Sequence, residues 1–156
     1  MASMDSHVKK GTDIQSDISK GVETIQEMGK EFQGVKDALQ GMPGGLDADL
    51  TALIQNVETQ GKSEVSADIE STKSSVIDQA KTTADTLKSD VTTKIGENTT
   101  ARGKLDGITS KYGKDAVSQA KTAIDANSQK GQDLIKDLEA AIQKADSDVQ
   151  TVKGNI

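Results

Sequence analysis

Apolar residues recur every seven positions through the first part of the chain, and this spacing constrains the fold more than any other feature. One row contains Ile18, Ile25, Phe32 and Leu39, and a second row, which starts at Ile14, contains Gly21, Met28, Val35 and Met42. Two such rows form the a/d seam of a coiled coil. We therefore predict a helix over about residues 7–40 whose packing or partner-binding seam contains Ile18, Ile25, Met28, Phe32, Val35 and Leu39.

The segment LQGMPGGLD, residues 39–47, interrupts this helical pattern. Gly41 can close the first helix in a left-handed conformation, and Pro43, the single proline, cannot continue it. Gly44 and Gly45 can then reverse the chain, and Asp47 suits the N-cap of a second helix. The sequence thus predicts a helical-hairpin turn at Gly41, Pro43, Gly44 and Gly45.

The second predicted helix covers about residues 47–95 and shows an eleven-residue rhythm. Val65, Val76 and Leu87 form one row, and Ile69, Ala80 and Val91 form a neighbouring row. Eleven residues over three turns give a nearly straight stripe. Because the stripe is diluted by threonine and alanine, and the chain is acidic, we expect it to pack against other helices rather than bind lipid.

The segment GENTTARGKLDGITSKYG, residues 96–113, is a second break that contains four glycines. Asn98, Thr99 or Thr100 could cap a returning helix over about residues 99–153, with a further break near 107–113. The sequence therefore predicts one all-α domain over residues 1–156, an elongated antiparallel three-helix bundle with coiled-coil-like seams. The bundle has four helices if residues 99–111 form a helix of their own.

Composition argues against several classes of function. The formal charge is −6, and the chain has one Phe, one Tyr and no Trp, so neither a basic surface nor a stacking platform for nucleic acid is expected. Cysteine is absent, and the single histidine, His7, is expected in a loosely structured start of the chain, where no partner orients it as a base. We predict no catalytic, cofactor-binding or metal-binding residues, and a non-enzymatic protein.

Two helices joined by GMPGG at residues 41–45, with few aromatic residues and no cysteine, resemble the Trp-x-Gly helical-hairpin proteins of bacterial type VII secretion and the helical partners of LXG effectors. The motif tryptophan is replaced, since Met42-Pro43-Gly44 stands at its place. The resemblance implies a secreted or secretion-associated helical partner that acts on a protein or on itself through helix seams. The N-terminus MASMDSHVKK lacks an apolar signal stretch, so secretion would proceed without a cleavable signal peptide; otherwise we expect a cytoplasmic protein with no membrane association.

An alternative follows from the eleven-residue rhythm. The segment IDQAKTTADTLKSDVTTKI is similar to repeats of late-embryogenesis-abundant proteins and exchangeable apolipoproteins in its use of Ala, Thr, Lys and Asp. This similarity implies an amphipathic stress-type protein that binds lipid surfaces.

Overall fold

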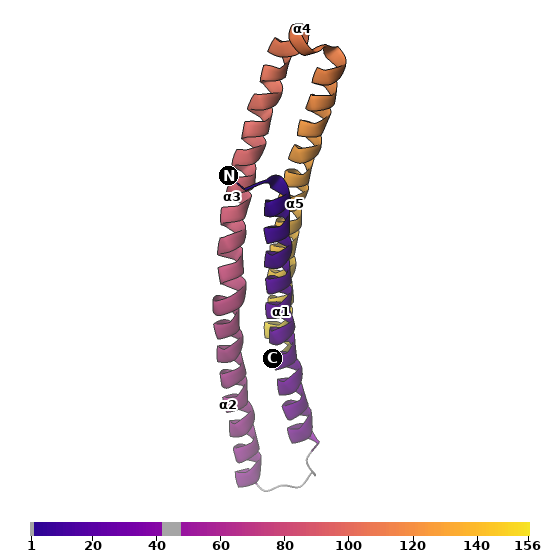
Figure 1. Ribbon diagram of the computed structural model, residues 1–156. Helices are drawn as coiled ribbons and strands as arrows, with labels where there is room; N and C mark the ends of the chain where they lie inside the picture. Colours follow the sequence, from indigo (N-terminus) through magenta and orange to yellow (C-terminus); the bar gives the residue numbers. More distant parts are fainter. Residues whose placement is uncertain (1, 42–47) are drawn as a thin grey trace. The chain divides into compact units, whose positions relative to one another are not determined.

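A computed structural model describes residues 2–41 and 48–156, and within these ranges the chain is all-α and contains no strand (Figure 1). The elements are α1 (Met4–Gln40), α2 (Ala48–Thr72), the π-helix η1 (Lys73–Asp78), α3 (Gln79–Lys104), the 3₁₀-helix η2 (Leu105–Ile108), α4 (Thr109–Tyr112) and α5 (Lys114–Asn155). The all-α prediction is confirmed. Of the predicted hairpin turn, Gly41 is described and its N–H donates to the Asp37 carbonyl at 2.9 Å. Pro43, Gly44 and Gly45, with Met42 and Asp47, lie outside the described residues.

The second break lies within the predicted range of residues 96–113 but is confined to its later part, η2 (Leu105–Ile108), α4 (Thr109–Tyr112) and Gly113. The hydroxyls of Thr99 and Thr100, expected as helix caps, donate to the carbonyls of Ile95 and Gly96 within α3. Such bonds to the preceding turn satisfy a threonine inside a helix, so α3 continues to Lys104. The chain turns through η2 and α4, and Gly113, with φ of 87°, supplies the left-handed backbone that ends α4. No helix starts at residue 99, because α3 continues through it, and the long helix α5 begins at Lys114, directly after the break predicted near residues 107–113.

The chain divides into two compact units. The first unit comprises Met1–Ser16 and Lys81–Ala141, and the second comprises Asp17–Ala80 and Ile142–Ile156. Helices α1, α3 and α5 each contribute residues to both units.

In the first unit, α5 runs antiparallel to α3 and parallel to α1. Contacts from α3 to α5 step backwards along α5, from Asn98 with Ser128 to Arg102 with Asp125. Contacts from α1 step forwards, since Asp5 pairs with Lys130 and Gly11 lies against Leu134. The buried apolar side chains are those of Met4, Ile14, Ala84, Leu87, Val91, Val117, Leu134 and Leu138.

The second unit has the same helix directions. Gly21 of α1 lies against Val76 and Ile77, whereas Phe32 further along α1 lies against Gly61, so α2 and η1 run antiparallel to α1. Val152 of α5 lies against Gly29. The buried apolar side chains are those of Ile18, Val22, Ile25, Phe32, Ile69, Ile77, Ala80, Ala145 and Val149.

The π-helix η1 explains how the eleven-residue row stays on one face. Ile69, Ala80 and Val91 are all buried, as predicted for packing. From Ile77 onward the buried positions advance by three and four residues, but Ile77 follows Ile69 by eight residues instead of seven. A π-helical turn takes up one residue more than an α-helical turn, so η1 absorbs the additional residue and the row remains facing the other helices. Lys73 and Asp78, five residues apart, pair across it at 3.5 Å.

Candidate interaction surface

The predicted seam of α1 is buried only as far as Phe32. Ile18, Ile25 and Phe32 are 3%, 0% and 4% exposed, as expected for a core. Met28 and Leu39 are half-buried and Val35 is 47% exposed, so the packed part of the predicted seam ends at Phe32. The cause is the length of α5, which is parallel to α1, has Val152 level with Gly29 and ends at Asn155. Beyond Phe32, α1 therefore has α2 beside it but no third helix.

The end of the α1–α2 pair carries apolar side chains on its surface. Leu50, Leu53 and Val57 follow one stripe of α2 at three- and four-residue spacing, and they are 45%, 57% and 47% exposed. Ile54 of α2 is half-buried. Between Phe32 and Ile69 no described residue is buried. We call this set the hairpin-end surface; it consists of Val35, Leu39, Leu50, Leu53, Ile54 and Val57.

Carboxylates outnumber ammonium groups around the hairpin-end surface. Asp37 of α1 and Asp49 and Glu58 of α2 belong to the same two helix ends, against Lys36. The Nζ atom of Lys36 lies 5.9 Å from the centre of the Phe32 ring. The Lys36 side chain therefore lies along α1 toward the seam. The described residues of these two helix ends thus carry three carboxylates and one ammonium group, and the carboxylate of Asp37 accepts a hydrogen bond from Gln33 at 2.9 Å.

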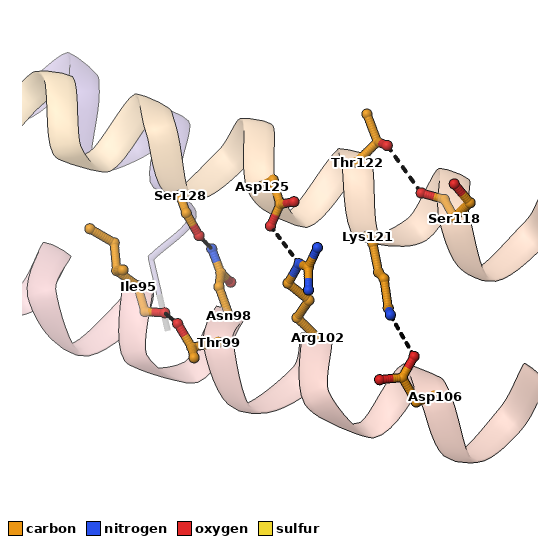
Figure 2. Close-up of polar contacts among 10 residues, drawn as sticks. All are labelled: Ile95, Asn98, Thr99, Arg102, Asp106, Ser118, Lys121, Thr122, Asp125 and Ser128. Carbon is orange, nitrogen blue, oxygen red and sulfur yellow. Dashed lines mark hydrogen bonds and ion pairs between the residues drawn. The ribbon is translucent and has the colours of Figure 1, made fainter.

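The α3–α5 end of the first unit also consists of two helices but is joined by polar contacts (Figure 2). Asn98 donates to Asn127 at 2.9 Å and to Ser128 at 3.1 Å, and Arg102 pairs with Asp125 at 2.8 Å. Lys121 donates to Asp106 at 2.5 Å. This hydrogen bond and the charge of Lys121 hold the pKa of the Asp106 carboxyl below its usual value of 3.8. The polar side chains of this end bind one another across the helices.

His7 is placed differently from the prediction. Ser3 accepts a hydrogen bond from the Ser6 N–H at 3.1 Å and so caps α1, which begins at Met4, before the histidine. His7 is only 5% exposed, and its Nδ1 has no hydrogen-bond partner among the described residues. The signal was present in the sequence, because His7 lies seven residues before Ile14 and continues its row. His7 is a seam residue rather than part of a loose terminus.

A groove of about 520 Å³ lies between α1 and α3 in the first unit. Its lining supplies hydroxyls, carboxylates and one ammonium group but neither imidazole nor thiol; it consists of Lys10, Asp13, Ile14, Thr82, Thr83, Thr86, Leu87 and Asp90. Such a lining offers hydrogen-bond donors and acceptors. In residues 2–41 and 48–156 no three His, Cys, Asp or Glu side chains are grouped so that they could hold a metal ion.

Comparison with protein-family models, with curated proteins and with solved structures finds no match to this chain. Within the described ranges, no helix combines the length and the apolar character that a membrane crossing requires.

Proposed function

We propose that this chain is a non-enzymatic helical interaction protein that binds another protein chain, or a second copy of itself, through exposed helix seams. The observation that carries the proposal is the hairpin-end surface, where Val35, Leu53 and Val57 are each about half exposed on neighbouring helices. Scattered exposed apolar residues are normal, but apolar side chains gathered on adjacent helices are typical of an interaction site.

The proposed architecture is an antiparallel three-helix bundle with coiled-coil-like seams. Support comes from the buried positions of α1, which advance by three and four residues from Met4 to Gly21. On α5, Val117, Gly131, Leu138 and Ala145 are buried at multiples of seven residues. In this architecture the hairpin-end surface is a seam with two of its three helices present.

A role in bacterial secretion is part of the proposal, on the basis of the helical-hairpin resemblance around GMPGG. A lipid-surface role is less favoured, because Ile69, Ala80 and Val91 of the eleven-residue stripe are buried against protein. Vesicles would have to compete with packing that already covers this row.

Site-specific photo-crosslinking in the source cells tests the proposal. A photoreactive residue at position 53 should form adducts with protein, whereas one at position 112, where Tyr112 is equally exposed at 57%, should form few. Adducts with lipid at position 53, or a large gain in helical circular dichroism on addition of anionic vesicles, would favour the lipid-surface alternative. Absence of protein adducts at position 53 would contradict the proposed function.

A further inference from the structure

His7 is a titratable side chain that is packed in the core of the first unit. It is only 5% exposed, and its Nδ1 atom has no hydrogen-bond partner among the described residues. Buried polar atoms normally have such a partner, because leaving one unpaired costs free energy. The imidazole therefore fills a core position without the hydrogen bond that usually stabilises a buried ring nitrogen.

The contacts one turn to either side of His7 show what surrounds it. Before it, the Met4 side chain lies against Gly131 of α5, and after it, Gly11 lies against Leu134 of α5. All four of these residues are buried. The imidazole is thus enclosed at a close approach of two helices, where the neighbouring side chains are apolar.

The charged side chains around this level do not favour a cation. Val91 of α3 lies against the same Gly131, so α1, α3 and α5 meet here. Within a turn of this level the three helices carry five lysines and three aspartates, none of them buried: Asp5, Lys9, Lys10, Lys88, Asp90, Lys94, Lys130 and Asp133. Asp5 pairs with Lys130 at 3.1 Å, and Asp133 accepts a hydrogen bond from within α5 at 2.8 Å. Ammonium groups therefore outnumber carboxylates, and two of the three carboxylates are already engaged.

We propose that His7 makes the packing of the first turns of α1 sensitive to pH. The neutral imidazole is packed like the apolar residues of its row, but protonation adds a full charge and a second N–H donor, for which a neighbour such as Leu134 offers no acceptor. An unpaired buried charge is costly, so the protonated chain favours release of residues 3–11 from α3 and α5. Imidazole in water takes up its proton as the pH falls through about 6.5. Packing is therefore complete above that pH and weakens below it.

The position of the segment allows release without unfolding of the whole chain. Residues 3–11 form the first turns of α1, and Gly11 at their end weakens the helix. Their ion pair to α5, between Asp5 and Lys130, lies at the surface, where such pairs contribute little. The segment is therefore held chiefly by the packing around Met4, His7 and Gly11, which is where the added charge acts.

The test is NMR hydrogen exchange on the full chain at pH 7.5, 6.5 and 5.5, expressed as protection factors so that the intrinsic pH dependence of exchange cancels. The amides of residues 7–11 report on the segment, since the His7 N–H already donates within the helix, to the Ser3 carbonyl at 3.1 Å. We expect their opening to rise by up to about tenfold for each pH unit below about 6.5, because the packed and released states differ by one bound proton. His7 is the single histidine, so its ring signals report protonation in the same samples.

Two variants and an internal reference separate His7 from other effects of acid. His7→Leu keeps an apolar side chain in the row and removes the titratable group, so protection at residues 7–11 should be equal at pH 7.5 and 5.5. Asp5→Asn removes the nearest carboxylate of the segment and should keep the pH dependence. The amides of residues 22–28, in the second unit, should remain protected throughout.

Four outcomes would overturn the proposal: equal protection of residues 7–11 at pH 7.5 and 5.5, the same pH dependence in His7→Leu, a protonated His7 ring in a segment that stays protected, or an equal loss of protection at residues 22–28. The first, third and fourth are measured on the unchanged chain, so they decide the matter even if His7→Leu does not fold.

Discussion

Two ends of this protein each consist of a pair of adjacent helices, the α3–α5 end of the first unit and the α1–α2 end of the second. The side-chain contacts between the two helices differ at these ends. At the α3–α5 end of the first unit, Asn98, Arg102 and Asp106 each bind a side chain of the opposite helix. At the α1–α2 end of the second unit, Gln33 donates to Asp37 and Gln60 donates to Glu64, and both bonds stay within one helix. The first pair is held by polar contacts, whereas the second leaves leucine and valine exposed.

The comparison teaches that exposure alone does not identify an interaction surface. Neither end has a third helix, and both have few buried residues. Ile108 and Tyr112 are exposed at the α3–α5 end as well, at 39% and 57%. What distinguishes the α1–α2 end is that exposed leucine and valine side chains gather on two adjacent helices, and burial of apolar surface is favourable.

The largest expected change in stability comes from a substitution at Phe32, the last buried residue of α1 before the hairpin-end surface. Phe32→Ala should lower the free energy of unfolding by about 3 kcal/mol or more, because Phe32 is 4% exposed. Val35→Ala, one turn further along α1, should cost less than about 1 kcal/mol. Denaturant unfolding followed by circular dichroism measures both. Equal losses would mean that the core extends past Phe32, and the contrast between the two ends would fail.

Two glycines of α1, Gly21 and Gly34, lie on either side of the boundary at Phe32. Their substitution by alanine should change the free energy of unfolding in opposite directions. A Cβ at Gly21 would lie 2.9 Å from Val76 and 3.0 Å from Ile77, whose β-branched side chains adjust little. Gly21→Ala should therefore destabilise the chain by about 1 to 3 kcal/mol. Gly34→Ala, where nothing lies within 4 Å, should stabilise it by up to about 1 kcal/mol through helix propensity. Thermal melts showing the same sign for both variants would contradict the packing described for η1.

At the polar end, Asn98→Ala should cost about 1 kcal/mol, since the part-buried amide loses its bonds to Asn127 and Ser128. Val57→Ala at the hairpin end is the comparison, because it removes an exposed apolar group and no hydrogen bond, and it should be nearly neutral. Urea unfolding of the two variants gives the difference. A neutral Asn98→Ala would show that the polar contacts do not hold α3 to α5.

The smallest effect concerns acid. The pKa of Asp106 is lowered in the folded chain, first by the Lys121 hydrogen bond and then by its charge. Its contribution to stability is therefore present above the usual pKa of 3.8 and is lost as the pH falls through the lower folded pKa. Carboxyl NMR titration should show a higher Asp106 pKa in Lys121→Met than in the unchanged chain. Around neutral pH the carboxyl is ionised in both the folded and the unfolded chain, so the free energy of unfolding should not change with pH there on account of Asp106. An unchanged Asp106 pKa in the variant would rule out the ion pair in solution.

The heptad rows predict part of the candidate surface, namely its residues on α1. They do not predict whether those residues are buried or exposed. The rows correctly placed Ile18, Ile25 and Phe32 in the core and put Val35 and Leu39 on the same face. They could not show that Val35 is exposed, because a row records which residues share a face and not how far a neighbouring helix reaches. The role of Leu50, Leu53 and Val57 was missed, although their three- and four-residue spacing was a visible signal.

By itself the sequence determined what depends on neighbouring residues: an all-α chain, the seam of α1 as far as Phe32, the eleven-residue row and a break at Gly113, since periodicity and backbone freedom are local properties. Only the tertiary structure decided where α5 ends along α1, that His7 is buried, and that η1 absorbs an additional residue of the row. These features depend on the register between helices distant in sequence. The difference between a buried core residue such as Phe32 and an exposed one such as Val35 is set by that register.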